Sequence, residues 1–72
     1  MFRYLPFKEN MHSDELGDYI TFGIKAFNPS GCETICISDV SVNEAFVTDL
    51  CRKCMDAQLD PIHLLEVIED YI

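Results

Sequence analysis

The last fourteen residues of the chain, Leu59–Ile72, read LDPIHLLEVIEDYI and describe a helix together with its start. Asp60 is a good helix N-cap, and Pro61 suits the first helical position, where its missing N–H group would have no helical partner. Apolar residues then recur at helical spacing: Ile62, Leu65, Ile68 and Ile72, widened by Leu64, Val67 and Tyr71. We therefore predict a C-terminal amphipathic helix whose apolar stripe closes the core.

Another helical pattern precedes this one. Ser41 followed by Glu44 is typical of a capping box, in which each side chain accepts from the backbone N–H of the other end of the turn. Apolar residues then follow at three- and four-residue spacing: Val42, Ala45, Phe46, Val47, Leu50, Cys51, Cys54 and Met55. The helix should end near Gln58, so the two helices are close in sequence and are expected to form a tight αα-hairpin against a sheet.

Before residue 40 the hydrophobic period is two, which predicts strands. Between Asp18 and Phe27 the apolar residues alternate with others, in the order Ile20, Phe22, Ile24 and Ala26. The sequence NPSG at residues 28–31 is typical of a turn. A β-branched segment from Glu33 to Asp39 follows, so we predict an antiparallel hairpin.

The N-terminal segment is less regular. Phe2, Tyr4, Leu5 and Phe7 favour a strand, but Pro6 cannot donate to a central ladder, so this should be a short edge strand. The polar segment Glu9–Gly17 is expected to be a mobile connection. We predict one small α+β domain over residues 1–72, with residues 1–17 partly flexible. It should hold a β-hairpin or three-stranded antiparallel sheet, followed by two C-terminal helices on one face.

Several short blocks of this sequence carry a family resemblance. They are Phe22-Gly23-Ile24, Asp39-Val40-Ser41, Pro61-Ile62-His63-Leu64 and Val67-Ile68-Glu69-Asp70. In their order they resemble an uncharacterised family of small bacterial proteins, chiefly clostridial, that is classed as a domain of unknown function. The resemblance covers about the last fifty residues. It implies an architecture and assigns no catalytic or binding residue.

Charge is unevenly distributed along the chain. The net charge is −8, from 13 acidic and 5 basic residues, and from Asn28 onward the only cations are Arg52 and Lys53. Such a surface repels phosphate backbones and anionic membranes, so we expect neither nucleic acid nor membrane as a partner. Solubility alone would explain the charge. The functional interpretation is a basic protein partner.

Four cysteines, Cys32, Cys36, Cys51 and Cys54, have the spacing CxxxC and CxxC. A zinc site is one interpretation, but the first pair falls on a strand and the second on the apolar side of a helix, without the turns that structural zinc sites use. We expect all four to be buried or half-buried core thiols. A redox CxxC motif is a weaker alternative, because Cys51 would lie far from the helix N-terminus that activates such thiols.

His63, Glu66 and Asp70 form the other candidate group, since helical spacing places them and Asp60 on a shared face. They could bind a divalent metal or transfer protons, although a solvated polar face explains the same pattern. His12, with Asp14 and Glu15, is a weaker candidate.

No known catalytic motif is present, and a chain of 72 residues leaves little room for a walled site. We therefore expect a small cytoplasmic protein-interaction or regulatory module, not an enzyme, without a cofactor. Self-association is also expected, from the small core and the edge strand.

Overall fold

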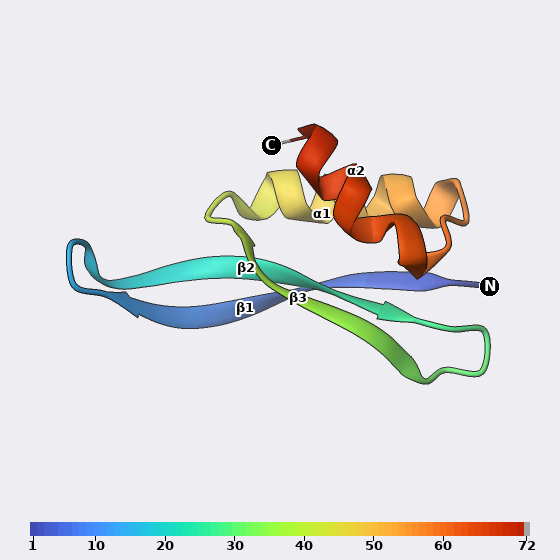
Figure 1. Cartoon of the computed structure of the whole chain (residues 1–72), viewed down its shortest axis with the longest axis horizontal. Helices are drawn as coiled ribbons and strands as arrows, with labels where there is room; N and C mark the ends of the chain where they lie inside the picture. The colour runs from blue at the N-terminus through green and yellow to red at the C-terminus, as the bar shows by residue number, and fades with distance from the viewer. Residues whose placement is uncertain (72) are drawn as a thin grey trace.

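The computed structural model describes residues 1–71 as a three-stranded antiparallel sheet followed by two helices. In chain order the elements are β1 (Arg3–Ser13), β2 (Gly17–Phe27), β3 (Glu33–Ser41), α1 (Glu44–Asp56), the short 3₁₀ helix η1 (Pro61–His63) and α2 (Leu64–Tyr71). The strand order is β1-β2-β3, and both helices lie on the same side of the sheet (Figure 1). The predicted α+β architecture is confirmed.

The first two strands form a long hairpin. β1 pairs with β2 along its whole length, from Arg3 opposite Phe27 to Ser13 opposite Gly17. The predicted position at the sheet edge is confirmed, but β1 has 11 residues and is not short. The mobile connection expected from Glu9 to Gly17 is wrong as far as Ser13. Residues 9–13 lack the apolar alternation of a core strand because this end of the hairpin extends away from the core. Backbone hydrogen bonds to β2 hold it in place.

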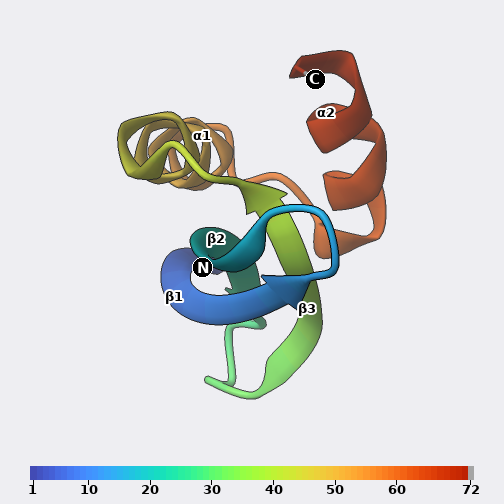
Figure 2. The ribbon, with the colours of Figure 1, turned by 90° about the vertical axis from the view of Figure 1, so that its left-hand side faces the viewer.

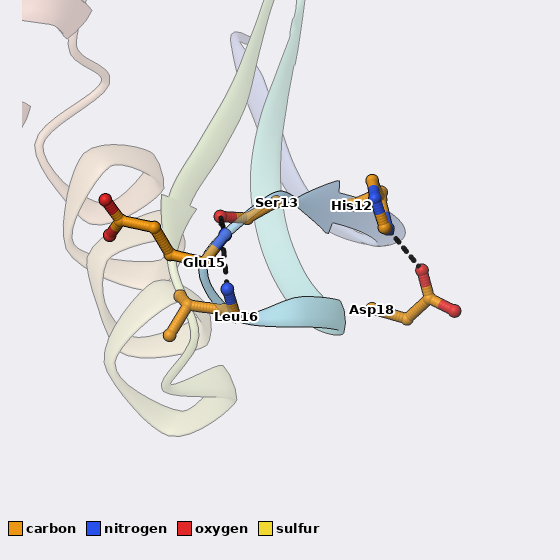
Figure 3. Close-up of polar contacts among 5 residues, drawn as sticks. All are labelled: His12, Ser13, Glu15, Leu16 and Asp18. Atoms are coloured by element: carbon orange, nitrogen blue, oxygen red, sulfur yellow. Dashed lines mark hydrogen bonds and ion pairs between the residues drawn. The ribbon is translucent and has the colours of Figure 1, made fainter.

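At the end of this hairpin the chain turns through residues 14–16. The Ser13 hydroxyl accepts from the backbone N–H groups of Glu15 and Leu16 at 3.2 and 3.4 Å (Figure 3). Gly17 then has φ +72°, a conformation that glycine adopts without strain. A hydroxyl that caps the turn and a glycine that ends it define where β2 begins.

The second hairpin joins β2 to β3 through the predicted turn. The Gly31 N–H donates to the Asn28 carbonyl oxygen at 2.9 Å, and the Asn28 side chain accepts from two further N–H groups. On β2 the alternation is confirmed for Ile24 and Ala26, which are fully buried beneath the helices. Ile20 is exposed, because the far end of the hairpin extends beyond the helices.

Helix α1 begins two residues later than predicted. Asn43 is the N-cap, and its side-chain oxygen accepts from the Phe46 N–H at 3.2 Å. Ser41 still belongs to β3, and its hydroxyl accepts from the Asn43 N–H at 3.1 Å, so the predicted capping box does not form. α1 contacts all three strands, β1 most extensively. Its buried residues are Val47, Leu50, Cys51 and Cys54, whereas Val42 and Ala45 are exposed.

The start of the last helical segment is confirmed. Asp60 accepts from the Ile62 N–H at 3.1 Å, and Pro61 occupies the first position. The predicted stripe is confirmed only in part: Leu64 and Ile68 are buried as predicted, but Ile62 is 78% and Leu65 54% exposed. Tyr71 is also exposed. Ile72, the last residue of the predicted stripe, lies outside the described residues.

The two helices cross steeply and do not form the tight αα-hairpin that their short connection suggested. Figure 2 shows α1 end-on above β1 and β2, with α2 displaced towards β3. The helices and the sheet enclose a core of ten buried residues: Tyr4, Ile24, Ala26, Val40, Val47, Leu50, Cys51, Cys54, Leu64 and Ile68.

The N-terminus is attached to the helical layer by polar contacts. The Phe2 N–H donates to the Gln58 side chain at 2.8 Å, and the Gln58 amide donates back to the Phe2 carbonyl oxygen at 3.2 Å. The Tyr4 hydroxyl donates to the Leu59 carbonyl oxygen. The start of β1 is therefore fixed to the segment that joins α1 to η1.

Candidate functional site

The four cysteines occupy two different environments. Cys32 and Cys36 are exposed, at the start of and within β3, so the expectation that all four are core thiols is wrong for this pair. Cys51 and Cys54 lie in the core. Residues 1–71 contain no group of three or more His, Cys, Asp or Glu side chains placed to hold a metal ion.

Burial also opposes redox activation of the α1 thiols. Burial, with a smaller contribution from the neighbouring Cys54, raises the pKa of Cys51 to about 12. Burial likewise raises the pKa of Cys54. Because the thiolate is the reactive form, both thiols are suppressed as nucleophiles at neutral pH.

We expect two of the four thiols to react with Ellman's reagent in the native protein. Cys32 and Cys36 should react within minutes, whereas Cys51 and Cys54, which are 2% and 3% exposed, should react only after unfolding in denaturant. A Cys32→Ser/Cys36→Ser variant should show almost no native reaction. Four thiols reacting at one rate in native wild type would contradict this placement.

His63, Glu66 and Asp70 lie on exposed positions of η1 and α2. The nearest approach is 3.8 Å, between His63 Nδ1 and a Glu66 carboxylate oxygen, and both side chains are largely exposed. A surface pair at this distance contributes little to stability. Helical spacing correctly placed the three residues on the surface, and among the described residues no buried acid–base pair forms around them.

His12 lies at the end of the first hairpin, where its partner is Asp18 and not the expected Asp14 or Glu15. His12 Nδ1 is 2.9 Å from Asp18 Oδ1 (Figure 3). The two residues face each other in the strand register. Both side chains are exposed, at 69% and 93%, so the contact is a solvated cross-strand pair.

A polar network that the sequence did not reveal lies on the sheet face opposite the helices. The Glu9 carboxylate on β1 accepts from the Ser38 hydroxyl at 2.7 Å and from the Asp39 N–H at 3.1 Å, both on β3. β1 and β3 are separated by β2 in the sheet, so Glu9 reaches across the central strand. This network ties the two edge strands together.

Asp39 is the centre of that network. It has φ +54°, and its carboxylate accepts from the buried Thr21 hydroxyl at 2.7 Å and from the Tyr19 hydroxyl at 3.3 Å. Partial desolvation, then the Asp39 carboxylate, raise the pKa of Tyr19. The hydrogen bonds satisfy these groups within the protein, which indicates a structural role at an irregular point of the β2–β3 register.

The outward side of the last helical segment combines acidic and apolar side chains. Ile62, Leu65, Glu66 and Glu69 follow the spacing i, i+3, i+4 and i+7, and all four are exposed. We call these four residues the α2 outer face. Sequence reasoning had placed Ile62 and Leu65 in the core, so the apolar part of this surface was missed.

These features define a small acidic α+β domain with a mixed acidic and apolar surface on its last helix. The chain matches a family of unknown function, DUF6514, over residues 2–72, and it therefore belongs to that family. The predicted membership of a domain of unknown function is confirmed, and the match extends well beyond the last fifty residues. Comparisons with curated proteins and with solved structures found no match. Within residues 1–71, no helix is long and apolar enough to cross a membrane.

Proposed function

We propose that this domain is a non-catalytic interaction module that binds a basic protein partner through the α2 outer face. The observation that carries the proposal is the exposure of Ile62 and Leu65 beside Glu66 and Glu69. Protein interfaces commonly combine an apolar centre with charged residues around it. The same helix buries Leu64 and Ile68 in the core, so the α2 outer face is held in place by the fold.

Carboxylates outnumber cations in and around this region. From Cys54 to Ile72 the sequence holds five carboxylates and no lysine or arginine. The cations immediately before it, Arg52 and Lys53, both contact Asp49, with Lys53 Nζ 3.0 Å from that carboxylate. Hydrogen bonds from Arg52 and then Lys53 lower the pKa of Asp49, so it is ionised at neutral pH. Lys53 Nζ also lies 5.3 Å from the centroid of the Tyr71 ring on α2. The remaining acidic potential favours a basic partner.

The alternative functions have less support. The zinc interpretation needs four cysteines in one place, whereas two lie in the core and two on the surface. The redox interpretation needs an activated thiol, whereas burial raises the pKa of both α1 cysteines. An acidic interaction surface needs neither a cluster of cysteines nor an activated thiol.

Charge reversal on α2 tests the proposal. Tagged wild type and a Glu66→Lys/Glu69→Lys variant are used to capture proteins from a lysate of the native host at low salt, followed by mass spectrometry. We expect wild type to enrich a basic protein, and the variant to lose it by tenfold or more, because two reversed charges face the partner. Captured protein should also fall as salt is raised.

A matched control separates position from net charge. Asp14→Lys/Glu15→Lys makes the same change in net charge at the exposed end of the first hairpin. Circular dichroism confirms that each variant is folded. Capture should survive in this control. Equal loss in both variants, equal capture by both, or no basic protein enriched by wild type would contradict the proposal.

A further inference from the structure

The two edges of the sheet differ in how well they are protected against further strand pairing. Edge strands expose unpaired backbone donors and acceptors, and proteins commonly block them with proline and with lysine or arginine. β1 carries Pro6 together with Arg3 and Lys8. β3 contains no proline, lysine or arginine between Glu33 and Ser41. Its free edge therefore lacks these blocking residues, and between the two register shifts residues 35–37 pair regularly with β2.

A shallow apolar pocket lies beside the beginning of this open edge. Its volume is about 230 Å³, and its lining comes from the N-terminus, β3 and the start of the last helical segment: Phe2, Thr34, Ile35, Asp60, Pro61 and Ile62. α2 lies on the β3 side of the sheet (Figure 2). Side chains of a strand alternate between faces, so a strand added to β3 would direct every second side chain towards this pocket.

The charges around the edge determine what kind of strand fits. Glu33 and Asp39 lie on β3, and Asp60 lines the pocket. The only cation paired with them among the described residues is Lys25, which is 3.9 Å from Glu33 and contributes little at that distance. A second copy of the chain would bring another net charge of −8 and another cation-free edge, and is disfavoured. A basic strand complements the site.

We propose that β3 accepts an extended segment of the partner as a fourth strand, with alternating apolar and basic residues. The apolar side chains face the pocket beside η1, and the basic ones face the carboxylates of β3 on the opposite side of the sheet. Backbone hydrogen bonds to the β3 edge supply affinity, while the pocket and the charges supply specificity. This inference rests on the proposed function and names the chemistry of the partner segment.

The test uses a synthetic peptide of eight residues that alternates lysine and valine and is capped at both ends. Binding to ¹⁵N-labelled wild type is followed by NMR and amide hydrogen exchange. Residues 34–38 should show the largest shifts and slowed exchange. A second peptide has four consecutive N-methylated residues at its centre. It keeps every side chain but loses backbone N–H donors along both of its own edges. It should bind at least tenfold more weakly, because several backbone hydrogen bonds to the β3 edge are lost.

Side-chain variants test the pocket in the same experiment. Ile62→Ser should weaken binding of the unmodified peptide by about fivefold, since part of an apolar contact is lost. Leu16→Ser is the matched control, because Leu16 is 74% exposed at the hairpin end, and it should leave binding unchanged.

The outcomes also separate this inference from the proposed function. Equal binding of both peptides, or shifts confined to α2, would overturn strand addition while leaving docking on the α2 outer face intact. Protection of the residue 34–38 amides without peptide, with a dimeric mass by light scattering, would overturn it in favour of pairing between two copies.

Discussion

Replacing Gly23 with alanine should remove most of the stability of the fold at 25 °C. A Cβ atom at this position would lie against the Ile37 carbonyl oxygen of β3 and 2.6 Å from Cζ of the Phe7 ring. The first obstacle is backbone in a paired strand, so it cannot move aside without breaking the ladder. We expect a loss of about 2–4 kcal/mol, which is comparable to the whole stability of a domain of this size.

The matched control is Gly31→Ala. Gly31 has φ +88°, but no atom lies within 4 Å of an added Cβ, so the cost is conformational only, about 1 kcal/mol. Urea unfolding followed by circular dichroism measures both variants. Similar stabilities for the two would show that Gly23 tolerates a side chain and that the β2–β3 packing is looser than described.

Leu64→Ala should destabilise the domain by about 3 kcal/mol and detach α2 from the sheet. The Leu64 side chain is fully buried in the core, and its truncation leaves a cavity that the surrounding residues fill only in part. Because α2 has eight residues and could not persist alone, it should lose its helical signal before the sheet unfolds.

Leu65→Ala is the adjacent control, with the same chemical change at a site that is 54% exposed. We expect its effect to stay within about 0.5 kcal/mol. Thermal and urea unfolding measure the global effect, and NMR shifts of α2 report its detachment. The sequence-based stripe placed both leucines in the core, so a loss at Leu65 as large as at Leu64 would contradict the exposure of Leu65.

Sequence patterns predicted the architecture because local signals agreed with the tertiary structure. Alternation through Ile24 and Ala26, the turn at residues 28–31 and the Asp60-Pro61 helix start each follow from short-range physics. The errors lie where two local solutions compete. Both Ser41 and Asn43 are good N-caps, and extension of β3 through Ser41 decides between them.

The phase of α2 was beyond sequence reasoning for a related reason. Apolar residues cover much of the circumference of the last helical segment. Its sequence is therefore compatible with either of two neighbouring apolar stripes facing the core. The segment begins with a 3₁₀ turn, which advances further per residue than an α-helix and rotates the stripe that meets the core. Leu64 is thereby buried and Leu65 exposed.

The candidate sites were predicted unevenly. The exposed positions of His63, Glu66 and Asp70 followed from helical spacing. The network of Glu9 and Asp39 did not, because these residues are thirty positions apart and meet only when the sheet curls. The exposure of Cys32 and Cys36 depends on β3 being an edge strand with one open face.

The hydrogen bonds between Phe2 and Gln58 have a consequence for how the chain folds during synthesis. They join residues 56 positions apart, and the core closes only when Leu64 and Ile68 reach Ile24 and Tyr4. Contacts of such long range slow folding relative to local ones. On the ribosome, the first hairpin can form early. Its apolar face, however, stays uncovered until Leu64 and Ile68 have emerged, so the core should not close before that point.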